Sequence, residues 1–95
     1  MNTIMNLKTG NHVKIASISN TKQFILAGME SRNQGEIKNI NLIELRAGVS
    51  LIFQKIDPRH FNDALFHIQG ISTNVEIWIS ESDLKECKFH LQSSI

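Results

Sequence analysis

The residues best suited to contact a ligand lie in the short stretch from Asp57 to Asp63, between two strand-like runs. In this stretch an arginine and a histidine could contact phosphate, and a phenylalanine ring could stack on a base. An asparagine and an aspartate could form hydrogen bonds with a sugar hydroxyl or a base edge. Loops that carry function have this composition, but so do tight connections whose Asn and Asp side chains bond their own backbone. The candidate binding residues here are Arg59, His60, Phe61, Asn62 and Asp63.

Trp78 is the only tryptophan, and it falls on the polar side of the alternating run Val75–Ser80. Exposed there, it could stack on a nucleobase or anchor a partner protein. Alternatively, a C-terminal helix covers this side and makes Trp78 part of the core, which the usual burial of tryptophan slightly favours. Four basic residues could follow a nucleic-acid backbone: Lys14, Lys22, Arg46 and Lys55.

Catalytic and metal-binding patterns are missing from the sequence. The four histidines are scattered, and a single cysteine cannot build a zinc site of the usual kind. Cys87 is best explained as a small packing residue of a terminal helix, and His67 as a half-buried sheet histidine. We therefore expect no enzyme activity, no cofactor and no metal.

The 95 residues are enough for one domain, expected to span 1–95 with 1–10 as a flexible or edge segment. Net charge is +1, but residues 1–59 hold eight basic and four acidic groups, whereas residues 60–95 hold two and five. A mixed, solvated surface is favoured over a basic nucleic-acid tract. The N-terminus has no signal-peptide pattern, no apolar run reaches the ~20 residues of a membrane helix, and one cysteine suits a reducing cytoplasm.

Alternating apolar residues predict five strands, and Ser19-Asn20-Thr21 reads as a turn. The polar run 31–35 is expected to be a loop, Ile37–Leu45 a short helical turn, and Ile56–Asn62 a loop. A C-terminal helix is expected from Ser80 or Ser82 as N-cap through Leu91. The expected strands are 12–18, 24–29, 49–55, 64–69 and 75–80.

This order predicts a mostly β fold: a small, partly open antiparallel β-barrel of SH3-like or OB-like type, with a short helical turn and a C-terminal helix. Gly28, inside a strand, suggests a bulge or a close backbone approach.

Several short motifs together resemble those of the HIRAN domain, a small β-barrel found alone in bacteria and phages and in some helicase-like ATPases. Phe24–Met29 resembles its first strand, Leu45–Phe53 the basic and glycine-containing entry to the next strand, and Asp57-Pro58 with Asn62–Leu65 its signature loop. Trp78-Ile79 stands at its aromatic-aliphatic pair. The resemblance covers Phe24 to Leu84. It implies a site for the 3′ end of single-stranded DNA in this loop, with Phe61-Asn62, or His60-Phe61 in an ungapped register, at the family's aromatic-aspartate pair.

Two functions follow as expectations. The first is a stand-alone module that binds single-stranded nucleic acid or DNA ends through the loop between two strands. The second is a phage or mobile-element protein that binds a host protein and inhibits or adapts it; its acidic C-terminal third could mimic nucleic acid. An exposed strand edge could also form a homodimer. We expect no membrane partner and a cytoplasmic location.

Overall fold

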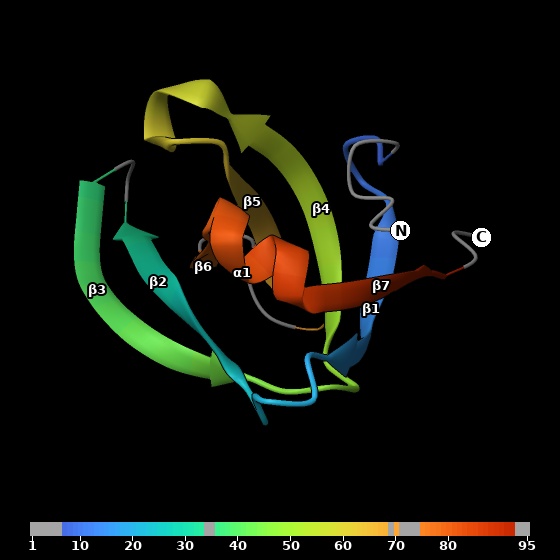
Figure 1. Ribbon diagram of the computed structural model, residues 1–95. Helices are drawn as coiled ribbons and strands as arrows, with labels where there is room; N and C mark the ends of the chain where they lie inside the picture. The colour runs from blue at the N-terminus through green and yellow to red at the C-terminus, as the bar shows by residue number, and fades with distance from the viewer. Residues whose placement is uncertain (1–6, 34–35, 69, 71–74, 93–95) are drawn as a thin grey trace.

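The computed structural model describes residues 7–33, 36–68, 70 and 75–92. One antiparallel sheet of seven strands dominates it, in the order β3-β2-β6-β5-β4-β1-β7. The sheet curves into an open half-barrel, with α1 drawn across its open side (Figure 1). The mostly β, partly open antiparallel barrel is thus confirmed. The elements are β1 His12–Ile18, β2 Ile25–Asn33, β3 Glu36–Leu45, β4 Ser50–Asp57, a 3-10 turn Pro58–His60, β5 Asp63–Ile68, β6 Val75–Ile79, α1 Glu81–Glu86 and β7 Cys87–Leu91.

The concave side of the sheet holds the hydrophobic core, because alternate strand residues point to one face. Phe66 is central: its ring packs edge-on against Phe53 at 5.6 Å between centroids and is stacked with Phe89 at 6.0 Å. The core residues are Val13, Ile15, Ile25, Ala27, Leu45, Leu51, Phe53, Ala64, Phe66, Ile77, Ile79, Leu84 and Cys87. The opposite, convex side is called the outer face below.

The short helix α1 closes the concave side of the half-barrel. Ser80 is its N-cap, since the Ser80 hydroxyl accepts a hydrogen bond from the Asp83 amide at 3.2 Å. Leu84 is buried in the core with Ile77 and Ile79. The helix therefore covers the core rather than the outer face. No helix in the described part of the chain is long and apolar enough to cross a membrane.

The prediction of a helical turn at Ile37–Leu45 is wrong, because this segment is the ten-residue strand β3, paired with β2. The ladder shifts register at Ser31 and Arg32, whose partners are Asn39 and Ile37, so Lys38 falls between the pairs as a bulge. The extra residue shifts the phase of alternation between Ile37 and Ile40, whereas positions 40 and 43 fall on opposite faces of a regular ladder; the helix-like spacing therefore combines a bulge with apolar residues on both faces. The loop expected at 31–35 is also wrong for residues 31–33, which continue β2, while 34–35 lie outside the described residues.

The prediction of a helix through Leu91 is wrong after Glu86, where the chain changes to β7 and pairs with β1. Cys87 is buried as predicted, but at the start of a strand. The five predicted strands are confirmed, four of them with shifted ends, and the turn at Ser19 is confirmed. Gln69, expected at the end of one strand, lies outside the described residues. Residues 1–6, most of the expected N-terminal segment, also lie outside them. The proline-containing loop is shorter than expected, because β4 continues to Asp57.

Candidate functional site

The candidate binding loop connects β4 and β5 and begins with a side-chain cap. Asp57, which is buried, accepts a hydrogen bond through Oδ1 from the Arg59 amide at 2.9 Å and caps the 3-10 turn that starts at Pro58. Its carbonyl oxygen accepts a bond from the Asn62 amide at 3.1 Å. Asp63 then pairs with Asp57 across the two strands. Five residues, 58–62, are therefore held in one compact turn, and the predicted loop residues are brought together.

Phe61 is displayed at the end of this turn in an unusual backbone conformation. Its φ is 57° and that of Asn62 is 63°, both left-handed. Asn tolerates this region, but for a bulky residue it costs roughly 1–2 kcal/mol. The Phe61 side chain nevertheless remains 87% exposed, so burial of the ring does not offset that cost. A strained backbone that holds an exposed aromatic ring is typical of binding loops.

Two cations lie beside the Asp57 carboxylate at the base of the loop. Lys55 Nζ is 3.8 Å from Oδ2, and Arg59 Nε is 3.9 Å from Oδ1. The Arg59 side chain is 89% exposed, so its pair is weak and the guanidinium can turn toward a ligand at little cost. His60 ends the 3-10 turn, and its side chain lies outside the described part of the structure.

Trp78 lies on the outer face, within a row of residues that crosses five strands. The expectation that the C-terminal helix covers this face is wrong, because α1 packs on the concave side with Leu84 in the core. Trp78 is half-buried. It lies opposite Gly28, where an added side chain would bring its Cβ atom to 3.9 Å from the Trp78 Cβ, an ordinary van der Waals distance. The row, read by strand register, is Leu42, Gly28, Trp78, Leu65 and Lys55.

Phe61 and Trp78 are linked through β5, and they do not form a single stacked pair. Leu65, directly opposite Trp78, is four residues from Phe61, a span of at most about 14 Å between Cα atoms. Asp63 lies between them, on the outer face like Leu65, because strand residues alternate. Leu65 is itself buried, so Phe61 and Trp78 are separate candidate contact residues.

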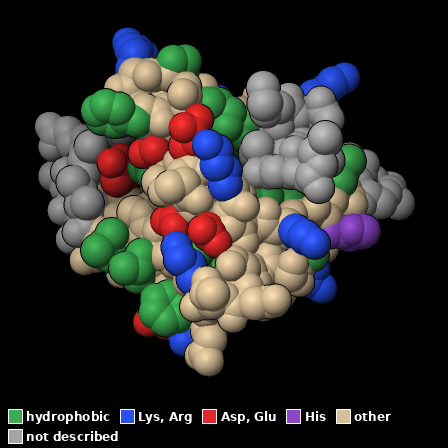
Figure 2. Space-filling model, viewed as in Figure 1, with side chains coloured by type: hydrophobic (Ala, Val, Ile, Leu, Met, Phe, Trp, Pro, Cys, Tyr) green, Lys and Arg blue, Asp and Glu red, His purple; other side chains and the backbone are tan. Residues whose placement is uncertain are grey.

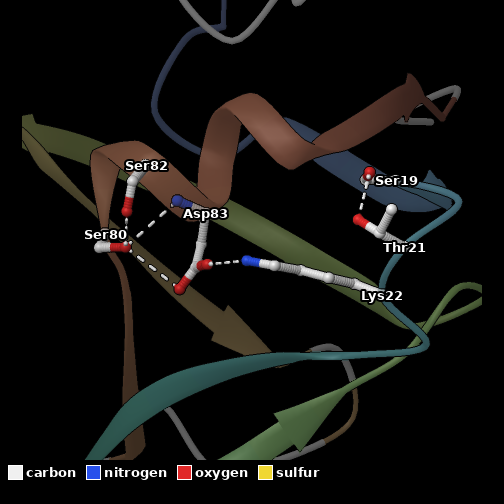
Figure 3. Close-up of polar contacts among 6 residues, drawn as sticks. All are labelled: Ser19, Thr21, Lys22, Ser80, Ser82 and Asp83. Atoms are coloured by element: carbon white, nitrogen blue, oxygen red, sulfur yellow. Dashed lines mark hydrogen bonds and ion pairs between the residues drawn. The ribbon is translucent and has the colours of Figure 1, made fainter.

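The other predicted basic residues are dispersed. Lys22, in the β1–β2 connection, pairs with Asp83 of α1 at 3.5 Å (Figure 3). Arg46 pairs with Glu44 at 2.9 Å. Lys14 is exposed and pairs in register with His90 of β7. Only Lys55 lies beside the binding loop, so the expected backbone path is not a continuous stripe.

Figure 2 shows the face that carries α1, where basic and acidic side chains are interspersed. This agrees with the mixed surface favoured by composition. The same side carries a groove of about 520 Å³, beside the β1–β2 connection, that sequence reasoning missed. Phe24 lines it, and the Arg46 guanidinium lies 5.2 Å from the centre of the Phe24 ring. The signal in the sequence was the apolar run Phe24–Leu26, which contains more apolar residues than one face of a strand can bury.

Among the side chains that the structure describes, Cys87 and the histidines form no cluster that suggests chemistry. Burial, followed by the nearby Asp83 and Glu86 charges, raises the pKa of the Cys87 thiol to about 11, which disfavours the nucleophilic thiolate. His67 is half-buried in β5 as predicted, with Nδ1 3.0 Å from the Val75 carbonyl oxygen. Among the described residues, no group of three or more His, Cys, Asp or Glu could hold a metal ion.

No known protein family, no curated protein and no solved structure matches this chain. The resemblance to the HIRAN domain therefore stays a prediction.

Proposed function

We propose that this protein is a binding module for single-stranded nucleic acid, with the β4–β5 loop as its contact element. The observation that carries the proposal is Phe61, an aromatic ring left 87% exposed on a strained, capped turn. Base–aromatic stacking contributes about 1–3 kcal/mol per base and tolerates any sequence. A pre-formed turn would keep most of this energy, because little loop entropy is lost on binding.

The charges around the loop support binding to only a few nucleotides. Arg59 and Lys55 are the described cations beside Phe61, and both contact one carboxylate loosely. A ligand with about two phosphate contacts would show a slope of log K against log salt near −1.4. Binding would be weak, and a strand end would suit the compact turn better than a long tract.

The alternative is a protein partner, for which Phe61 would be the anchor of a small interface. The dispersal of the basic residues favours it, since Lys22 and Arg46 already pair with Asp83 and Glu44. A protein partner would need no continuous basic path. The loop would then act in the inhibitor or adaptor role predicted from sequence.

Fluorescence anisotropy of a short labelled single strand, titrated with the protein at low and moderate salt, separates these functions. The nucleic-acid proposal predicts saturable binding with a shallow salt slope, weakened by Arg59→Ala. As a matched control, Lys14→Ala removes an exposed cation outside the loop and should leave the affinity nearly unchanged. Absence of binding at both salts would contradict the proposal and direct the search to a protein partner.

A further inference from the structure

The two edges of the sheet are protected to different degrees. The edge strand β7 has only five residues, and its exposed Lys88 is a common device against edge pairing. The other edge strand, β3, has ten residues and contains neither proline nor glycine. Only its β2 side is paired in the described sheet. A long edge of this kind is a template for another strand.

The bulge at Lys38 limits the part of β3 that can pair regularly. From Asn39 to Leu45 the register with β2 is continuous, which gives an unbroken run of seven residues. The run carries one charged residue, Glu44, and Arg46 neutralises it at 2.9 Å. The midpoint of the run is Leu42.

Among the strand residues whose side chains the structure describes, Leu42 is the most exposed large hydrophobic residue, at 72%. Leu26 of β2, 48% exposed, lies diagonally across from it on the same face, because Leu26 pairs with Glu44 and Leu42 with Gly28. Leu42 on the edge strand and Leu26 one strand further in form an apolar patch, and a strand added at β3 would cover the Leu42 side of it.

We propose that β3 pairs with β3 of a second copy of this chain, antiparallel about a two-fold axis at Leu42. This register uses the whole regular run and sets Leu42 opposite Leu42 of the second copy. Asn41 then lies opposite Ile43, and Glu44 opposite position 40, so like charges do not meet. The interface is self-complementary, as a two-fold dimer requires. It joins the two seven-stranded sheets into one and leaves the β4–β5 loop of each copy uncovered.

Charge argues against a two-fold axis at position 40 or 44, whereas axes at positions 41 and 43 bring no like charges together and are separated from the Leu42 axis by the cross-linking test below. An axis at position 40 would set Glu44 opposite Glu36, and an axis at position 44 would set Glu44 opposite itself. Like charges directly opposite each other destabilise a strand pair. A second copy supplies an exposed leucine opposite Leu42 and an uncharged position opposite Glu44, which is the self-complementarity that a two-fold dimer requires.

Disulfide trapping tests both the pairing and its register. In the full chain, Leu42→Cys is expected to form an interchain disulfide under mild oxidation, because directly opposite residues bring their Cβ atoms to about 4.5–5.5 Å. Glu44→Cys lies on the same strand and face but four positions from its copy, and should cross-link at least tenfold more slowly. The native Cys87 is buried, so the unmodified chain serves as the background.

Sedimentation equilibrium gives the second measurement. The unmodified protein should be a concentration-dependent dimer, and Leu42→Lys, which sets two like charges at the axis, should be a folded monomer by circular dichroism. Retained oligonucleotide binding by that monomer would separate this inference from the proposed function. The dimer would be overturned if the unmodified protein stayed monomeric across the micromolar range. The register would be overturned if Glu44→Cys formed the interchain disulfide as fast as Leu42→Cys.

Discussion

The Asp57 carboxylate and the Arg59 amide are joined by a 2.9 Å hydrogen bond, and this bond fixes the start of the turn that displays Phe61. Asp57→Ala removes the acceptor, so we expect a loss of about 1–2 kcal/mol in the free energy of unfolding, measured in urea. Asp57→Asn keeps an oxygen acceptor and should lose clearly less. Equal losses for the two variants would show that the charge, rather than the cap, stabilises the loop.

A glycine usually lowers the stability of a folded protein relative to an alanine, but the left-handed backbone at Phe61 reverses this order. Both Phe61→Ala and Phe61→Gly remove an exposed ring, but only glycine adopts a φ of 57° without steric cost. We expect Phe61→Gly to be the more stable of the two by about 1 kcal/mol in urea unfolding. The opposite order would contradict the conformation assigned to this turn.

The sequence left Ser80 and Ser82 as alternative N-caps for α1, and the structure assigns Ser80. Ser80→Ala should cost about 1 kcal/mol, because it removes the acceptor for the Asp83 amide. Ser82 is exposed, and Figure 3 shows its hydroxyl in contact with the Ser80 hydroxyl rather than with a backbone amide. Ser82→Ala is therefore the matched control, with an effect near zero. Chemical unfolding of both variants would decide between them, and a larger loss for Ser82→Ala would contradict the assignment.

The buried Cys87 thiol should react slowly in the native protein. With its pKa raised from 9.0 to about 11, the thiolate is scarce at pH 9, and alkylation should be at least roughly 50-fold slower than in the unfolded chain. A raised pKa favours the neutral thiol in the folded state. The stabilisation is therefore present below pH 9 and is lost as the pH rises toward 11. Rapid labelling by iodoacetamide at low denaturant would contradict this burial.

The strands that bury one face could be predicted from sequence, because alternation survives wherever the ladder is regular. The alternation correctly predicted that Val75, Ile77 and Ile79 share the core side of β6. Alternation fails as a guide for β3, because the bulge at Lys38 shifts its phase and because both faces of the regular part carry apolar residues. It fails again for β7, where Cys87, Phe89 and Leu91 alternate but directly follow a helix start, so that a continuing helix is predicted.

The candidate site was only partly predictable for a related reason. The loop residues are adjacent in sequence, so their grouping around Phe61 could be predicted without the fold. The cap by Asp57, the left-handed turn and the place of Trp78 on the face opposite α1 depend on tertiary contacts. Leu42 was missed because its strand had been assigned as helical.

The central claim is that Phe61 is the contact residue of the binding loop. The most direct test is fluorescence anisotropy of one labelled single strand, with its 3′ end free or blocked, titrated with the unmodified protein, with Phe61→Ala and with Leu91→Ala. Leu91 is also an exposed apolar side chain, 57% exposed, but it lies on β7. We predict that Phe61→Ala weakens binding by about tenfold or more, as the loss of one stacked base requires, while Leu91→Ala binds like the unmodified protein. Preference for the free end would favour strand-end recognition. Equal affinity of Phe61→Ala and the unmodified protein would contradict the account.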